Sequence, residues 1–200
     1  MSKKEELQKL KEKMEKDDSL PLKKGATRLV FGVGNSDTKI LFIGEGPGYH
    51  EDQRGEPFVG NAGSLLNQLL SSIKLDRKDV YITNVVHHRP PNNRDPEPIE
   101  IAAYGKYLDE IIKIIDSKVI VTLGRFSMGK FLPGARISSV HGKVNNIRWK
   151  GKDIIVIPMY HPAAALRNGE VMRQSKEDFL KLPGILEEAN QSKIEQGNLI

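Results

Sequence analysis

Three segments of the chain carry residue types that could do chemistry, and each follows an apolar run: Gly44–Gly48, Asn84–Arg94 and His161–Asn168. The first reads Gly-Glu-Gly-Pro-Gly, and its glycines let backbone N–H groups approach a ligand closely. It matches neither the dinucleotide-binding nor the P-loop glycine pattern. On its own, this segment is therefore either a backbone cradle for a ligand or an ordinary turn.

A polar amide and an aromatic ring add to this pattern. Asn84 closes the second apolar run, and its amide could pair with an edge that alternates C=O and N–H groups, as in a pyrimidine base. It could equally cap the end of a strand. Phe58 lies in the Gly- and Pro-containing stretch Arg54–Gly60, away from the expected strands and helices. Its ring is either a core anchor or a stacking surface for a planar ligand.

The other two segments carry cationic and imidazole groups. His87–Arg94 is basic and proline-rich, which suits a phosphate backbone. Its paired histidines could instead bind a metal, although no third ligand is spaced nearby. His161 could hydrogen-bond to a developing anion or could cap a helix. Beside it, Leu166 could wedge into a base stack while Arg167 meets a phosphate.

Strands and helices that alternate along the chain must position these segments. Continuous apolar runs predict strands at Lys39–Ile43, Val80–Asn84, Lys118–Leu123 and Asp153–Ile157, after a short strand at Leu29–Phe31 and a turn. Helical spacing predicts helices near Ser2–Lys16, Ala62–Ile73, Ile99–Ile115, Phe126–Phe131 and Ser175–Leu182, the last of which should stop before Pro183. The predicted fold is three-layer α/β/α with a central, mostly parallel four-stranded sheet. Ligands bind such sheets beyond the carboxyl ends of the strands, where all three segments lie.

The composition limits the classes of function. Lys and Arg exceed Asp and Glu by 31 to 26, and the net charge of +5 permits a polyanionic partner without proving one. The chain has no cysteine, which excludes disulfides, thiolate zinc sites, cysteine nucleophiles and cysteine-held iron–sulfur clusters. No apolar run approaches the roughly 18 residues of a membrane span, and Met1–Lys16 lacks signal-peptide character. We therefore expect a soluble cytoplasmic protein without membrane contact.

The 200 residues, 38% of them hydrophobic, fit one globular domain. We expect the domain to span residues 1–190, of which 1–25 form an N-terminal helix and linker, and a polar tail to occupy 191–200. We expect a monomer.

Taken together, the segments resemble the uracil-DNA glycosylase superfamily, and within it the family-4 enzymes of bacteria and archaea. The similarity covers roughly Asp17 to Leu182, in a fixed order and spacing that chance does not readily produce. The matching segments are Val30–Asn35, Gly44–Gly48, Glu51 and Asp52, Gly55, Pro57–Gly60, Ala62 and Gly63, Val80–Val86, Arg89–Arg94, Val121–Gly124, and His161–Asn168.

The resemblance implies cleavage of the N-glycosidic bond of deoxyuridine in DNA, with release of uracil from an abasic site. By position, Glu45, Gly46 and Pro47 would form the wall and backbone donors of a uracil pocket, and Glu51 would line its C5 edge. Phe58 would stack on the base, Asn84 would pair with its polar edge, and His161 would donate to its O2 as negative charge collects there. In better-known relatives an Asp positions the water, but here that position is Gly46. We therefore hypothesise that Glu45 or Asn92 orients the water and that leaving-group stabilisation carries most of the catalysis. We also expect a DNA-facing edge, formed by Arg89, Arg94, Leu166 and Arg167.

The chain departs from family 4 in one respect. Family-4 members carry four cysteines that hold a [4Fe–4S] cluster, and the matching positions here are Asp17, Leu20, His88 and Tyr104. Leucine cannot ligate a metal, so we expect no cofactor and a set of hydrogen bonds and apolar contacts in place of the cluster. The helix Glu5–Lys16, or a contact between Asp17 and His88, could take over its structural role.

Two other functions remain as alternatives. One is a non-catalytic uracil- or DNA-binding relative, against which the intact pocket positions argue. The other is a glycosylase with an altered base range, such as hypoxanthine. The expected partners are uracil-containing DNA, single- or double-stranded, and free uracil as product.

Overall fold

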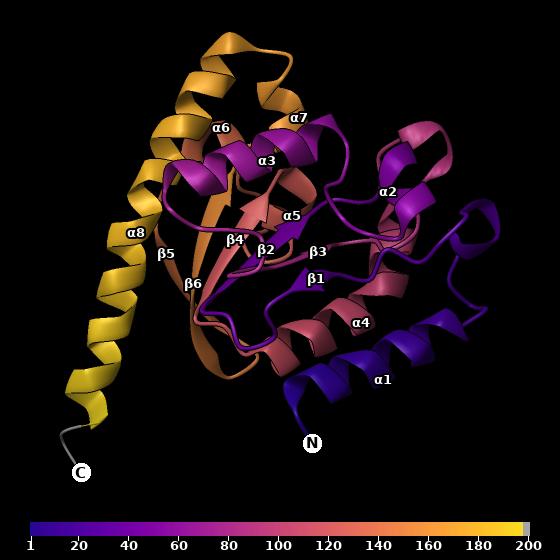
Figure 1. Ribbon diagram of the computed structural model, residues 1–200, viewed down its shortest axis with the longest axis horizontal. Helices are drawn as coiled ribbons and strands as arrows, with labels where there is room; N and C mark the ends of the chain where they lie inside the picture. Colours follow the sequence, from indigo (N-terminus) through magenta and orange to yellow (C-terminus); the bar gives the residue numbers. More distant parts are fainter. Residues whose placement is uncertain (198–200) are drawn as a thin grey trace.

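A computed structural model describes the backbone of residues 1–197 and the side chains of residues 1–189 (Figure 1). Within this part of the chain the sheet has six strands in the order β1-β3-β2-β4-β6-β5. The inner four are parallel and correspond to the predicted apolar runs: β2 (Ile40–Gly44), β3 (Tyr81–Asn84), β4 (Val119–Leu123) and β6 (Lys152–Met159). The predicted three-layer fold with a mostly parallel sheet is confirmed.

The predicted strand number of four is wrong, because two antiparallel strands close the edges of the sheet. β1 (Val33–Gly34) pairs with β3, and β5 (Asn145–Trp149) pairs with β6. The first strand was expected slightly earlier, at Leu29–Phe31, with a turn where β1 lies. Edge strands show weak sequence signals: β1 has only two residues, and the side chains of β5 are partly or fully exposed.

Helices α1 (Lys3–Glu15) and α4 (Pro98–Ile115) lie side by side on one face of the sheet (Figure 1). α1 begins at a capping box, in which the Ser2 hydroxyl accepts from Glu5 N and the Glu5 carboxylate accepts from Ser2 N. The apolar cluster between the helices and the sheet includes Leu7, Met14, Leu41, Ile43, Tyr104, Leu108, Ile111 and Ile120. α1 is thus anchored to α4 and the core through one apolar stripe.

Helices α3 (Asn61–Ser72) and α8 (Gly169–Gly197) cover the opposite face. The Phe42 ring of β2 stacks on the Phe179 ring of α8, with 6.1 Å between centroids. This second apolar cluster includes Phe42, Leu65, Leu66, Leu69, Ile82, Val121, Ile157, Phe179 and Leu182. Because the two clusters bury both faces of the parallel strands, these strands are almost uniformly apolar.

The prediction that the last helix stops before Pro183 is wrong, because α8 continues through it. Proline removes one helical hydrogen bond and crowds the preceding turn. Here Phe179 and Leu182 before the proline and Ala189 after it are all buried against the sheet. Burial on both sides of Pro183 holds the helix together. The expected polar tail at 191–200 lies within α8 up to residue 197, and residues 198–200 lie outside the described part.

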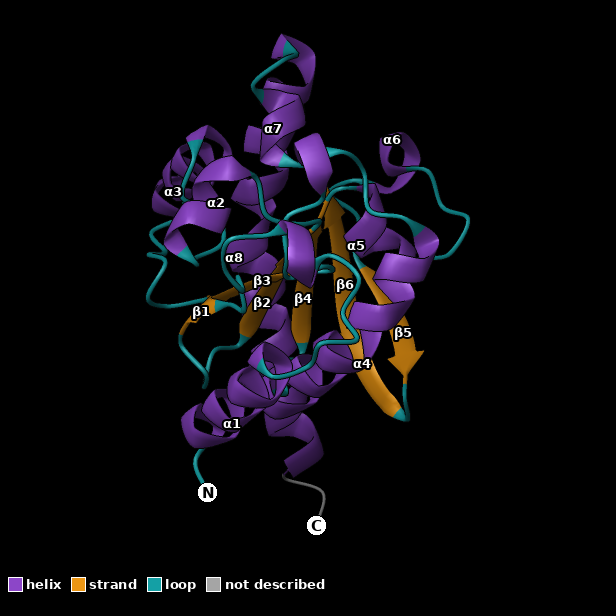
Figure 2. Cartoon of the chain, turned by 90° about the vertical axis from the view of Figure 1, so that its right-hand side faces the viewer, coloured by secondary structure: helices purple, strands orange, loops and turns teal. Residues whose placement is uncertain are grey.

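Short helices gather at the carboxyl ends of the parallel strands, beyond the arrowheads of β4 and β6 in Figure 2. They are α2 (Tyr49–Arg54), α5 (Arg125–Gly129), α6 (Ile137–Val140) and α7 (Pro162–Ala165), with single 3₁₀ turns at Lys23–Gly25 and Pro91–Asn93. Among the described helices, none has both the length and the apolar character needed to cross a lipid bilayer.

Candidate functional site

A cavity of about 330 Å³ opens at the carboxyl ends of the parallel strands, where the three predicted segments meet. Its wall contains nine of the site residues predicted from the sequence: Glu45, Gly46, Pro47, Glu51, Phe58, Asn84, Arg94, His161 and Arg167. The remaining wall residues are Gly48, Ala62, Pro90, Asn93, Asp95, Pro96 and Ala163. The size and the convergence of polar groups on an aromatic ring suit a small planar ligand.

Asn84 and Phe58 meet above Gly44, the last residue of β2. A Cβ at position 44 would lie 2.6 Å from Phe58 Cε2 and closer still to Asn84 Oδ1, so only glycine fits beneath them. Asn84 is 2% exposed, and among the described residues its side-chain amide has no hydrogen-bond partner. A buried amide that lines a cavity without an internal partner is suited to pairing with a ligand.

Phe58 has a left-handed backbone conformation, with φ of 54°. Such a conformation is unfavourable for a bulky residue and needs support from its surroundings. Arg77 provides it: its Nη1 donates to Phe58 O at 2.9 Å and its Nη2 donates to Pro57 O at 2.6 Å. Gly63 leaves room for the same carbonyl, which any Cβ there would overlap.

Glu51 holds the same segment from the other side. Its Oε1 accepts from Val59 N and Gly60 N at 2.9 Å each, and its Oε2 accepts from Gly48 N at 3.2 Å. The carboxylate therefore ties the glycine-rich loop to the Phe58 segment. Together, Glu51 and Arg77 fix the peptide groups on both sides of Phe58.

His161 is the N-cap residue of α7, and its Nδ1 accepts from Ala163 N at 3.1 Å. This bond places the ring proton on Nε2. Burial lowers the pKa of His161 to about 4, so the ring is neutral at pH 7. The imidazole also stacks on the Phe58 ring, with 5.5 Å between centroids and 28° between planes. The cavity wall thus contains a neutral imidazole with one N–H donor.

Glu45 caps the start of α5, where its Oε1 accepts from Phe126 N at 3.2 Å. Burial raises the pKa of its carboxyl, and the N–H groups of Phe126 and Arg125 partly oppose that effect. Gly124 has a positive φ of 102°, and a Cβ there would overlap the Glu45 carboxylate. The carboxylate is therefore fixed at one end of the cavity, next to a helix N-terminus.

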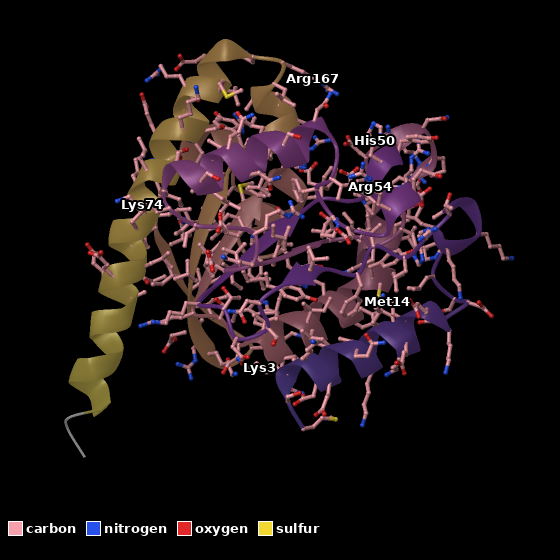
Figure 3. The ribbon with its side chains drawn as sticks, viewed as in Figure 1. Lys3, Met14, His50, Arg54, Lys74 and Arg167 are labelled. Atoms are coloured by element: carbon pink, nitrogen blue, oxygen red, sulfur yellow. The ribbon has the colours of Figure 1, made fainter. Side chains whose placement is uncertain are left out.

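The predicted DNA-facing residues have different environments. Arg94 forms a two-point ion pair with Glu100, at 2.9 and 2.6 Å. Arg89 donates through Nε to Asn93 Oδ1 at 2.7 Å and lies outside the cavity wall. Leu166 is 48% exposed, and Arg167 beside it lines the cavity. Figure 3 shows Arg167, His50 and Arg54 on one side of the molecule.

Some placements differ from the sequence-based expectation. Asn92 lies in the Pro91–Asn93 turn outside the cavity wall, and its neighbour Asn93 lines the wall instead. Arg77 was missed, because it belongs to no motif and acts on carbonyl groups 19 and 20 residues earlier in the chain. Only the positive φ of Phe58, which the sequence does not reveal, points to the need for such a residue.

The positions that match the cluster cysteines form direct contacts. His88 Nδ1 lies 2.8 Å from the Tyr104 hydroxyl, and both side chains and Leu20 are buried. Asp17 accepts from Tyr107 and Lys106 of α4, at 2.7 and 2.9 Å, rather than contacting His88. Among the described residues, no group of three or more His, Asp or Glu side chains could hold a metal ion. These side chains do not fit an iron–sulfur cluster.

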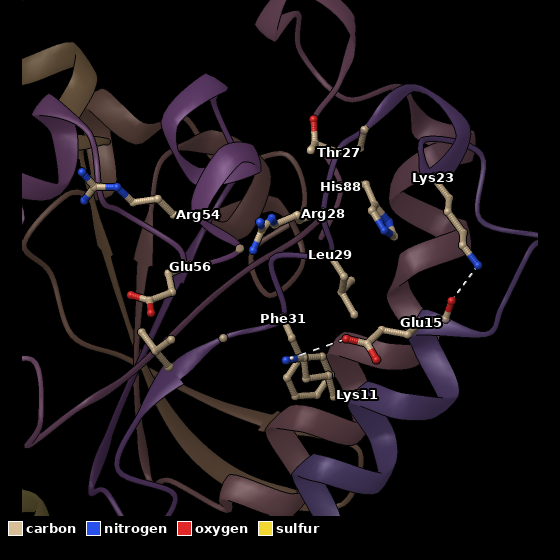
Figure 4. A pocket seen from close by; sticks show the side chains of 14 residues that line it. Lys11, Glu15, Lys23, Thr27, Arg28, Leu29, Phe31, Arg54, Glu56 and His88 are labelled. Atoms are coloured by element: carbon tan, nitrogen blue, oxygen red, sulfur yellow. Dashed lines mark hydrogen bonds and ion pairs between the residues drawn. The ribbon is translucent and has the colours of Figure 1, made fainter.

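A larger cavity, of about 700 Å³, lies beside α1 (Figure 4). Cationic side chains on its wall are partly satisfied within the protein: Lys11 pairs with Glu15, and Lys23 donates to Glu15 O and Asp18. It contains none of the predicted pocket residues, and no residue of β2, β3 or β6 lines its wall. Size alone therefore does not make it the functional site.

Residues 31–182 match the family model of the uracil DNA glycosylase superfamily. The chain is 48% identical over 166 residues to a type-4 uracil-DNA glycosylase of Archaeoglobus fulgidus, covering 80% of this chain and 83% of that protein. It is 46% identical over 172 residues to the type-4 enzyme of Thermotoga maritima, covering 85% and 89%. A type-5 uracil-DNA glycosylase of Thermus thermophilus is 33% identical over 120 residues, covering 52% and 54%. With the family model matching most of its length and type-4 relatives at this identity, the chain belongs to the uracil DNA glycosylase superfamily.

Proposed function

We propose that this protein is a monofunctional uracil-DNA glycosylase that hydrolyses the N-glycosidic bond of deoxyuridine in DNA. It releases uracil and leaves an abasic site, as the first step of base excision repair. The observation that carries the proposal is the junction of Phe58, Asn84 and His161 at one cavity of about 330 Å³. The names of its type-4 relatives support the same activity.

In this proposal the cavity receives a uracil flipped out of the DNA stack. Flipping costs a few kcal/mol, and stacking on Phe58, worth about 1–3 kcal/mol, offsets part of that cost. The Asn84 amide pairs with the polar edge of the base, while Gly46 and Pro47 form the wall. Glu51 excludes the methyl group of thymine indirectly, by fixing the Phe58 segment and Gly48 at the edge of the pocket.

His161 stabilises the leaving group. As the bond between C1′ and N1 breaks, its electron pair moves onto uracil, and negative charge collects at O2. The neutral imidazole, with its proton on Nε2, donates a hydrogen bond to that oxygen. Removal of one such donor typically slows a reaction about 10²–10³-fold. The low pKa of His161 keeps the ring neutral, so its role is to donate a hydrogen bond and not to transfer a proton.

Water completes the reaction at the oxocarbenium-like sugar. Glu45 is the better of the two hypothesised positioning groups, since it lines the cavity and Asn92 does not. Its raised pKa makes the carboxylate a stronger proton acceptor as water adds to C1′. The water oxygen bonds to C1′ and its proton passes to the carboxylate, which then releases a proton to solvent while the departing uracil anion takes one up.

The proposal requires no cofactor. The direct contacts of His88 with Tyr104 and of Asp17 with Tyr107 support a protein that folds without an iron–sulfur cluster. We also propose a cytoplasmic monomer that acts on DNA, with Arg89, Leu166 and Arg167 on the DNA-facing edge. Light scattering coupled to size-exclusion chromatography tests the monomer.

An alkali-cleavage assay tests the activity. Oligonucleotides with single-stranded U, U·A, U·G or hypoxanthine are incubated with the protein, and abasic sites are revealed by strand cleavage. His161→Ala and Asn84→Ala should each slow uracil release at least about tenfold, whereas Leu180→Ala, an exposed change on α8, should not. Binding without product on any substrate would favour a non-catalytic relative, and product only from hypoxanthine would favour an altered base range.

A further inference from the structure

Tyr49 is an exposed aromatic residue at the rim of the cavity. It is the first residue of α2 and directly follows Gly48, which lines the cavity wall. The residue is 53% exposed, and it is the one aromatic residue among the large apolar side chains that are exposed in the described part of the chain. The mechanism proposed above does not use it.

Two neighbouring side chains contact the ring. The Arg89 guanidinium carbon lies 5.2 Å from the centre of the Tyr49 ring, and the His50 ring meets it edge-on at 5.5 Å. Arg89 is itself fixed, because its Nε donates to Asn93 Oδ1 at 2.7 Å. Since Asn93 lines the cavity, the arrangement is continuous with the pocket. A ring with a cation against it is a pre-oriented stacking surface.

Two exposed large side chains are chain neighbours of residues in the cavity wall. The large side chains exposed within the described residues are Met1, Tyr49, Ile99, Val144, Leu166 and Leu180. Two of these, Tyr49 on α2 and Leu166 after α7, adjoin residues of the cavity wall. Figure 3 shows the labelled neighbours of this pair, His50 and Arg167, on the same side of the molecule. The cations Arg89 and Arg167 accompany the two apolar groups, which matches a chain of bases joined by phosphates.

We propose that Tyr49, supported by Arg89, is a second stacking surface, which binds an unpaired nucleobase next to the flipped deoxyuridine. In a duplex both faces of a neighbouring base are covered by the stack, whereas in a single strand a face is open to the ring. Tyr49 therefore favours single-stranded substrate. This inference rests on the proposed function, because it assumes that the flipped base enters the adjoining cavity.

Binding to uracil-free oligonucleotides tests the surface independently of catalysis. We compare wild type, Tyr49→Ala, Tyr49→Trp and the control Ile99→Ala by fluorescence anisotropy with a labelled thymidine 12-mer and with the same strand in a duplex. Ile99 is a suitable control because it is also exposed, at 71%, and lies on α4 outside the cavity wall. Loss of one stacked base, about 1–3 kcal/mol, predicts a 5- to 150-fold weaker affinity of Tyr49→Ala for the single strand. Duplex affinity should change less than twofold.

Tyr49→Trp should keep the affinity, and its added tryptophan emission, relative to wild type with Trp149 alone, should be quenched by the single strand. Unchanged single-strand affinity of Tyr49→Ala, or an equal loss on both DNA forms, would overturn the inference. Uracil release by the same variants separates the two proposals. If wild type released no uracil while Tyr49→Ala still lost single-strand affinity, the proposed function would fail and the stacking surface would stand.

Discussion

A methyl group at position 44 should disable the site while leaving the fold intact. In Gly44→Ala the new Cβ would lie 2.6 Å from Phe58 Cε2, where ordinary contacts begin at 3.4 Å, and closer still to Asn84 Oδ1. Phe58 cannot move as a whole, because Arg77 and Glu51 hold its flanking peptide groups. The ring and the amide must therefore turn away from the positions where they would contact uracil.

The expected magnitudes separate activity from stability. Overpacking of this kind costs about 1–3 kcal/mol of folding free energy, which a typical stability of about 5–15 kcal/mol tolerates. Loss of the stack, about 1–3 kcal/mol, together with one hydrogen bond of about 1 kcal/mol, removes roughly 2–4 kcal/mol of transition-state binding. That corresponds to a decrease of about 30- to 1,000-fold in kcat/KM.

The assay compares kcat/KM for uracil release with the free energy of unfolding in urea, at one temperature. The matched control is Gly105→Ala in α4, where the added Cβ has open space and where alanine should stabilise the helix by about 0.5–1 kcal/mol. If Gly44→Ala released uracil within threefold of the wild-type rate, Phe58 and Asn84 would not both contact the base, and the assignment of the pocket would be wrong.

Three further predictions follow from the same contacts. Arg77→Gln should lose the paired charged donors to Pro57 O and Phe58 O and lower kcat/KM at least about tenfold. Arg77→Lys should recover part of the activity. Unchanged kinetics in Arg77→Gln would argue against a positioning role. Burial lowers the pKa of His87 to about 3. Near pH 6.5 the His87 imidazole therefore binds a proton in the unfolded chain but not in the folded chain. Stability should therefore fall as pH decreases from about 7, by about 2 kcal/mol at pH 5 from this residue alone, and a flat urea midpoint over that range would contradict it. Chelation with EDTA should change neither the melting temperature nor uracil release, and stoichiometric iron or zinc in purified protein would refute a metal-free fold.

The sequence revealed the inner sheet because strands buried on both faces are continuous apolar runs, and β2, β4 and β6 are such runs. It did not reveal β1 and β5, whose edge positions impose no such pattern. Nor did it show that α8 passes through Pro183, since that depends on burial of side chains on both sides of the proline. Tertiary packing decides these cases.

For the site, too, the sequence predicted some residues and missed others. Three loops at the carboxyl ends of parallel strands had to converge, so Glu45, Asn84 and His161 could be grouped from the sequence. Supporting contacts could not be predicted, because Arg77 reaches Phe58 through backbone carbonyls and Glu51 acts through backbone N–H groups. Such contacts depend on where peptide groups point rather than on residue type.

The contacts around Tyr104 and Asp17 hold the segment that leads to the pocket loop. His88 precedes Arg89 and Pro90, so its bond to the Tyr104 hydroxyl fixes the start of the loop that ends at the cavity wall. Asp17 joins the segment after α1 to Tyr107, one helical turn from Tyr104 on α4. α4 thus connects the N-terminal segment with the loop after β3 through two hydrogen bonds.

These bonds also support the proposal that the protein folds without a metal. Burial lowers the pKa of His88 to about 4, so the imidazole stays neutral and bonds to Tyr104 without an unpaired charge in the core. Bonds to Ser19, Lys106 and Tyr107 hold the pKa of Asp17 far below its usual range, which keeps the carboxylate ionised at any pH near neutrality. The neutral pair, His88 and Tyr104, is buried, and the charged pair, Asp17 and Lys106, is partly exposed. Together these side-chain contacts link the two segments to α4. His88, which bonds to Tyr104, directly precedes Arg89, which contacts the Tyr49 ring. The same short segment therefore ties the loop to α4 and orients Tyr49.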